Sequence, residues 1–211
     1  MIPALSYHKN KLELNILDIC FGLGYNTLAT LYYIKKNKLS IKVNIFSPEF
    51  DDDLIKSLKN FNYPSEFSEL QHIIDSIATS YSYKDNNTSI DVFNGDAREY
   101  LVKLKDLNIN TFDIVYQDAF SSDVNHSLWT VEYFSDVYNL LSNDAILTTY
   151  SIATPIRLSI FNNNFLIYEY KPNDSNRITI ALNKAEIDTN YKYIDMELKQ
   201  KRNTTAKALY D

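Results

Sequence analysis

The sequence predicts an α/β protein in which an open, doubly wound sheet of mostly parallel strands ends in an antiparallel hairpin. Five short apolar runs alternate along the chain with segments of helical periodicity, which is the pattern of the strand–helix units that build a parallel sheet. Two further strand-like segments, residues 165–170 and 177–182, are separated only by the polar stretch 171–176, which favours a hairpin. Two of the three glycines, Gly22 and Gly24, directly follow the first apolar run, where the chain turns from strand to helix.

The first strand–helix unit shows the pattern in full. Residues 15–21 form a mostly apolar run that ends at glycines, which is typical of a strand buried on both faces. Residues 25–36 follow with apolar side chains at helical spacing and two lysines at the end, where positive charge suits the helix dipole. Pro48 is expected to end the second strand. The other expected strands cover residues 41–46, 90–93, 112–116 and 145–150, and the other expected helices cover residues 68–83, 129–141 and 155–161 together with one that begins near Asp51 and one from Asp96 to about Lys105.

Composition and charge exclude several classes of protein. The chain has 211 residues and three glycines, where average usage predicts about 15, so a collagen-like rod is excluded. No apolar run approaches the ~20 residues that a bilayer requires, and the single cysteine, Cys20, cannot form an internal disulfide. We therefore expect one cytoplasmic domain, 1–211, with 184–211 as a possible tail. The formal charge of −6 lacks the basic excess typical of nucleic-acid binders, although it leaves room for a local basic patch.

The glycine turn after the first strand predicts a ligand site at that end of the sheet. In an open α/β sheet, ligands bind beyond the carboxyl ends of the strands. Gly22 and Gly24, followed by Asn26, allow the backbone to approach a ligand at the start of a helix, where unpaired N–H groups lie. An ordinary strand–helix turn also uses glycines, but the scarcity of glycine in this chain favours the ligand.

Acidic residues follow the next three strands. Glu49 can accept both hydroxyls of a ribose, or it is an ordinary exposed loop acid. Asp96 can accept from an adenine amino group, cap the helix that follows, or do both. Asp118, with aromatic residues on either side, suits a substrate amine beside a cofactor. The set suits S-adenosylmethionine better than a nicotinamide dinucleotide, because Asn26 replaces the third glycine of a phosphate-binding turn.

Four stretches carry a resemblance to a known family. They are residues 18–26 (DICFGLGYN), residues 95–99 (GDARE), Asp118-Ala-Phe120 with Asn125 and Trp129-Thr130, and residues 148–157 (TTYSIATPIR). In this order they resemble the methyltransferase domain of the MnmC family, from about Ile16 to about Leu182, and the Asp-x-Phe…Asn…Trp-Thr stretch is the most diagnostic. The resemblance implies a Rossmann-like class I methyltransferase fold, with a mostly parallel seven-stranded sheet and a C-terminal antiparallel hairpin. It also implies the last methylation of 5-methylaminomethyl-2-thiouridine at the tRNA wobble position.

The resemblance further implies roles for individual residues. The cofactor S-adenosylmethionine is expected at Asp18, Phe21, Gly22, Gly24, Asn26, Glu49, Asp96, Ala97 and Asp118. Asp118 is the expected catalytic residue, and substrate contacts are expected at Phe120, Asn125, Trp129 and Arg157. Read from the sequence alone, Trp129 is more typical of a core or loop anchor, and Arg157 is also a candidate surface ion pair. The family usually has glycine where this chain has Cys20.

Three functions fit the sequence. The first is methyl transfer to the aminomethyl nitrogen of 5-aminomethyl-2-thiouridine in tRNA. The second is methyl transfer to a small amine, which the net charge of −6 favours, and the third is a S-adenosylmethionine-binding module without catalysis. For tRNA we expect a basic patch made of Arg157, Lys171, Arg177 and residues 199–207. No metal site is expected, because the three histidines lack ligand spacing. No membrane contact is expected, because no apolar run is long enough to cross a bilayer. The sequence does not indicate an oligomeric state.

Overall fold

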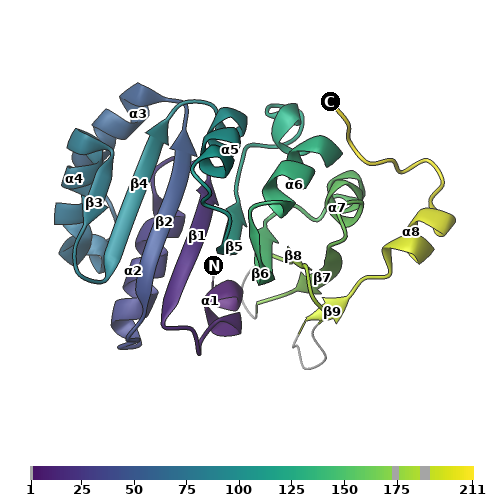
Figure 1. Cartoon of the computed structure of the whole chain (residues 1–211), viewed down its shortest axis with the longest axis horizontal. Helices are drawn as coiled ribbons and strands as arrows, with labels where there is room; N and C mark the ends of the chain where they lie inside the picture. The colour runs from purple at the N-terminus through teal and green to yellow at the C-terminus, as the bar shows by residue number, and fades with distance from the viewer. Residues whose placement is uncertain (1, 173–175, 186–190) are drawn as a thin grey trace. The chain divides into compact units, whose positions relative to one another are not determined.

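The computed structural model describes residues 2–172, 176–185 and 191–211, and the chain divides into two compact units, Met1–Tyr100 and Leu101–Asp211 (Figure 1). The single domain 1–211 stays a prediction. The described residues contain nine strands, which corrects the expected seven. The two additional strands have only three and two residues, too few to produce an alternating pattern in the sequence.

The first unit contains a four-stranded sheet in the order β3-β4-β2-β1 (Figure 1). Strands β1, β2 and β4 are parallel, and β3 is antiparallel to β4. The elements are α1 (Ile2–Tyr7), β1 (Glu13–Ile19), α2 (Tyr25–Lys36), β2 (Lys42–Glu49), α3 (Asp52–Ser57), the 3-10 turns η1 (Leu58–Asn60) and η2 (Ser65–Leu70), α4 (Gln71–Ser80), β3 (Ser82–Lys84) and β4 (Thr88–Asn94). Helix α5 (Ala97–Asp106) begins at the end of this unit.

Two expectations for the first unit are wrong in their limits. Strand β2 continues through Pro48 to Glu49, and the Pro48 carbonyl accepts the Phe21 N–H at 3.0 Å, so proline removes a donor there without ending the strand. The helix expected over residues 68–83 ends at Ser80, because Tyr81 takes a left-handed conformation with φ 58°. The chain then enters the β3–β4 hairpin, whose turn is held by the Asp85 carboxylate.

The second unit contains a mixed sheet in the order β5-β6-β8-β7-β9. Strands β5 and β6 are parallel, whereas β8 is antiparallel to both β6 and β7, and β9 is antiparallel to β7. The elements are β5 (Phe112–Gln117), the 3-10 turn η3 (His126–Leu128), α6 (Val131–Tyr138), β6 (Leu141–Thr149), α7 (Thr154–Phe161), β7 (Leu166–Tyr170), β8 (Ile178–Leu182), β9 (Lys192–Tyr193) and α8 (Met196–Arg202). The expected C-terminal hairpin is confirmed, although part of its loop lies outside the described residues.

The end of the chain packs against the start of α6. The Leu209 carbonyl accepts the Val131 N–H at 2.8 Å, and the Thr130 hydroxyl donates to the Asp211 carboxylate at 2.8 Å. The tail is therefore partly helical, in α8, and partly an extended segment bound to the helices of its own unit; residues 186–190 lie outside the described part. None of the helices described has the length and apolarity needed to cross a bilayer.

Candidate active site

In the first unit, three strand ends meet at Glu49. Its carboxylate accepts the Gly22 N–H at 2.7 Å and the Asp51 N–H at 2.9 Å. Its backbone carbonyl accepts the Gly95 N–H at 2.9 Å, since the β2–β4 register pairs Glu49 with Asn94. One residue thus joins the loops that follow β1, β2 and β4. Each carboxylate oxygen can accept a further hydrogen bond, so the residue is placed to receive hydroxyl donors as well.

The two glycines after β1 both have left-handed backbone conformations, with φ 57° at Gly22 and 71° at Gly24. A Cβ added to Gly24 would lie 2.7 Å from the end of the Phe21 ring, whereas one added to Gly22 would meet only the Cys20 carbonyl, at 3.8 Å. Gly24 is therefore required by packing inside the loop, and Phe21 is buried against it. The space beside Gly22 is open, and a side chain there would fill it. This open backbone turn fits the close approach of a ligand such as S-adenosylmethionine.

Asp18 and Asn26 hold the glycine turn from within. Asp18 is fully buried, and its carboxylate accepts from the Asn26 amide at 3.2 Å and from the Thr27 hydroxyl at 3.0 Å. The Ser47 hydroxyl donates to the Asp18 carbonyl. These bonds connect the end of β1 to the first turn of α2. They indicate that Asp18 positions the loop and is not exposed to a ligand as the structure stands.

Asp96 caps helix α5. Its Oδ1 atom accepts the N–H groups of Arg98, at 2.8 Å, and Glu99, at 3.2 Å. Ala97, the first residue of the helix, is buried. The helix-cap interpretation of Asp96 is therefore correct, and the contact with adenine stays a prediction for the same carboxylate.

In the second unit, Asp118 is exposed directly after β5, whose six residues are all buried. The two residues after it are fixed through their carbonyl groups. The Tyr150 hydroxyl donates to the Ala119 carbonyl at 2.9 Å, and the Trp129 indole N–H donates to the Phe120 carbonyl at 2.6 Å. The Phe120 ring itself is 72% exposed. A carboxylate and an aromatic ring are thus presented to solvent from a segment whose backbone is held in place.

Trp129 has an internal role in place of the expected substrate contact. Its side chain is fully buried and packs edge-on against Tyr150, with ring centroids 6.1 Å apart. Gln117 supports the same segment, since its amide donates to the Leu128 carbonyl at 2.9 Å and accepts from Tyr133 at 2.8 Å. Asn125 begins the η3 turn and is half-buried.

Sequence reasoning missed both Tyr150 and Gln117. Tyr150 is the last residue of an expected strand, and that position is the one signal that could have found it. Gln117 is an ordinary amide in an apolar run and gave no signal.

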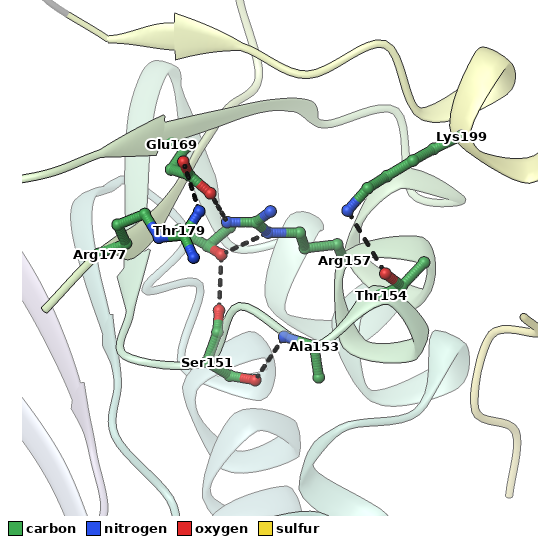
Figure 2. Close-up of polar contacts among 8 residues, drawn as sticks. All are labelled: Ser151, Ala153, Thr154, Arg157, Glu169, Arg177, Thr179 and Lys199. Carbon is green, nitrogen blue, oxygen red and sulfur yellow. Dashed lines mark hydrogen bonds and ion pairs between the residues drawn. The ribbon is translucent and has the colours of Figure 1, made fainter.

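Arg157 is also internal, which corrects the expectation of a surface contact with RNA. It is 2% exposed, its Nε donates to the Thr179 hydroxyl at 2.8 Å, and its Nη2 lies 3.1 Å from the Glu169 carboxylate (Figure 2). Burial lowers the pKa of Arg157, and Glu169 opposes this shift. For Glu169, burial alone would raise the pKa, but the hydrogen bonds and charges of Arg157 and Arg177 together outweigh it and lower the pKa. Of the remaining expected patch, Lys171 is exposed.

Comparison with known proteins gives consistent results. A family model described as S-adenosyl-L-methionine-dependent methyltransferase matches residues 66–184. The tRNA 5-methylaminomethyl-2-thiouridine biosynthesis bifunctional protein MnmC of Psychrobacter cryohalolentis is 24% identical over 202 residues, which cover 82% of this chain and 28% of that protein. An uncharacterized protein of Methanocaldococcus jannaschii is 25% identical over 182 residues, covering 83% of this chain and 48% of that protein. The chain therefore spans less than half the length of either curated relative.

Two solved structures are similar to the whole chain. MnmC2 from Aquifex aeolicus has a TM-score of 0.80 and 25% sequence identity, and the match covers 98% of this chain and 65% of that one. A probable spermidine synthase from Corynebacterium glutamicum has a TM-score of 0.62 at 14% identity, covering 100% of this chain and 77% of that one. The second likeness concerns the fold alone. Among the described residues, no group of three or more His, Cys, Asp or Glu side chains is placed to hold a metal ion.

Proposed function

Because this chain belongs to the S-adenosyl-L-methionine-dependent methyltransferase family, we propose that it methylates the aminomethyl nitrogen of 5-aminomethyl-2-thiouridine at the wobble position of tRNA. The observation that carries the proposal is the likeness to MnmC2 over 98% of the chain, together with the resemblance of the Asp118–Thr130 segment to the MnmC family. In the structure, that segment presents Asp118 and Phe120 at the surface.

The chain has the α/β class I methyltransferase fold, and its cofactor is S-adenosylmethionine. When bound, this cofactor supplies a methyl group activated by a sulfonium. We assign its ribose hydroxyls to Glu49 and its adenine amino group to Asp96, with the open backbone turn at Gly22 allowing close approach. Asp18, Phe21, Gly24, Asn26 and Ala97 shape the turn and the helix start around it.

Asp118 is the residue that we assign to the substrate amine. An aminomethyl nitrogen is largely protonated near neutral pH, and a protonated nitrogen has no lone pair with which to attack. An exposed carboxylate can hold the ammonium, orient the nitrogen and pass its proton to water. The product then carries one more methyl group and one proton fewer on that nitrogen. Tyr150 and Trp129 hold the backbone directly after Asp118, so the segment that carries the carboxylate is fixed for this step.

A small amine is the second candidate substrate. The formal charge of −6 favours it, because a strongly acidic protein attracts free polyamines and repels nucleic acid. The chemistry at Asp118 would be the same. The two candidates therefore differ in whether the methylated nitrogen belongs to a tRNA.

The direct test uses tRNA from a strain that lacks its own MnmC methyltransferase activity. Purified protein is incubated with isotope-labelled S-adenosylmethionine and this tRNA. The tRNA is then digested, and its nucleosides are separated by chromatography and identified by mass spectrometry. We expect label in 5-methylaminomethyl-2-thiouridine, and at least about 100-fold slower labelling with Asp118→Ala. Cofactor binding without incorporation into this tRNA, combined with turnover of a small amine, would replace this proposal by the second.

A further inference from the structure

Two arginines of the second unit pair with one carboxylate, and a lysine lies near them. Arg157 from α7 and Arg177 from the start of β8 approach the two oxygens of Glu169, at 3.1 Å and 3.5 Å. Lys199 from α8 interacts electrostatically with all three of these side chains, and its Nζ lies 3.4 Å from the Thr154 hydroxyl (Figure 2). The ion pairs of Glu169 therefore contain two positive charges and one negative charge, and Lys199 adds a third positive charge beside them. This arrangement leaves a surplus of positive charge in one place on an otherwise acidic chain.

The strand register extends the positive surface. In the antiparallel pairs, Glu169 faces Thr179 on one side and Lys192 of β9 on the other. Directly opposite residues of neighbouring strands point to the same face of a sheet, so Lys192 shares the face of Glu169. Its side chain is exposed. A fourth basic residue thus borders the cluster.

The cluster is buried at its centre and exposed at its edge. Arg157 is 3% exposed at its side chain and is engaged by Glu169 and Thr179, whereas the Arg177 side chain is 54% exposed. Lys199 is half-buried. Burial lowers its pKa, and the positive charge of Arg157 adds to the same shift. The charges of Arg157 and Arg177 disfavour the charged form of Lys199, and a bound anion would offset this repulsion between like charges.

We propose that Arg177 and Lys199 form a binding site for a backbone phosphate of tRNA, with Arg157 and Glu169 as the buried scaffold that holds it. The inference rests on the proposed function, because it takes tRNA as the substrate. It assigns positioning on RNA to a compact cluster, and it explains how a chain with a formal charge of −6 can hold a polyanion. Phosphate contacts of this kind position a nucleic acid without reading its sequence.

The test is the salt dependence of tRNA binding. Kd for unmodified bulk tRNA is measured over a range of salt concentrations for the full chain, for Arg177→Gln, for Lys199→Gln and for the double variant. We expect each single variant to flatten the log–log slope in part, and the double variant to flatten it by about 0.7–0.9, the value for one lost phosphate contact. The control is Lys105→Gln, which removes an exposed lysine near the end of α5 and should leave the slope unchanged.

Two outcomes would overturn the site. One is an unchanged slope in the double variant while S-adenosylmethionine binding and Tm are preserved. The other is a rise in Tm with inorganic phosphate that the double variant abolishes, again with an unchanged tRNA slope, since that would identify a site for a free anion. In both cases methyl transfer by the full chain into tRNA would leave the proposed function standing. Failure of the proposed function itself is recognised separately, by the absence of that transfer at low salt.

Discussion

The acidic residues of the candidate site are held differently in the two units of the molecule. In Met1–Tyr100, the carboxylates of Glu49 and Asp96 each accept two backbone N–H groups, so the acids are part of the loops that they belong to. In Leu101–Asp211, Asp118 is exposed, and what is fixed is the backbone after it. Substitution of Glu49 or Asp96 therefore changes loop shape together with binding, whereas the bonds of Tyr150 and Trp129 to the backbone after Asp118 do not depend on the Asp118 side chain.

The largest expected effect concerns the scaffold of the second unit. Arg157→Ala removes the buried partner of Glu169 and should lower the free energy of unfolding by about 3 kcal/mol, the lower end for breaking a buried ion pair, because Arg177 still faces the carboxylate. Arg177→Ala is the matched control, since it removes the exposed partner of the same carboxylate and should cost at most about 1 kcal/mol. Denaturant unfolding measures both. Equal losses would show that burial does not distinguish the two arginines.

Asp118→Ala tests the claim that chemistry in the second unit is separable from structure. We expect at least about 100-fold slower methyl transfer under single-turnover conditions, the low end for a positioned proton-transfer group. Tm and the Kd for S-adenosylmethionine should stay close to those of the full chain, because the segment is held through the Ala119 and Phe120 carbonyls. A normal rate would remove Asp118 from the mechanism.

Glu49→Gln tests the opposite claim for the first unit. The amide keeps the shape of the carboxylate, but it loses the charge that strengthens its bonds to N–H and hydroxyl donors. Calorimetry should show S-adenosylmethionine binding weakened by about 1–3 kcal/mol. Glu69→Gln, which changes an exposed acid paired with Lys35, serves as the control. An unchanged affinity of Glu49→Gln for S-adenosylmethionine would contradict the assignment of this residue to the ribose.

The smallest expected effect concerns backbone strain in the glycine turn. Cys20 has a left-handed φ of 65°, which disfavours side chains by about 1–2 kcal/mol. Cys20→Gly relieves this strain but adds freedom to the unfolded chain, so the net gain in unfolding free energy should be at most about 1 kcal/mol. Lys38→Gly, at φ 51° after α2, is the matched substitution away from the site. A loss of stability in Cys20→Gly alone would mean that the thiol contributes contacts that outweigh the strain.

The sequence was most informative where a backbone constraint selects the residue type. Gly22 and Gly24 could be predicted because a left-handed turn and the packing of Phe21 exclude most side chains. The hairpin of β7 and β8 was predictable from two alternating segments, whereas β3 and β9 were too short to show a period. The placement of Trp129 and Arg157 could not be predicted. Both are residue types that bind RNA and that also fill cores, and only tertiary contacts show that the structure buries them.

The bond between the Gly22 N–H and the Glu49 carboxylate, 2.7 Å long, makes one backbone proton a reporter for the whole loop. An amide exchanges its hydrogen with solvent when its hydrogen bond opens, and the rate measures how often that happens. Ligand hydroxyls that clamp Glu49 would hold the same carboxylate against Gly22 and slow the exchange. Deuterium uptake at the Gly22 amide would then follow the opening and closing of the glycine turn in solution without a chemical label.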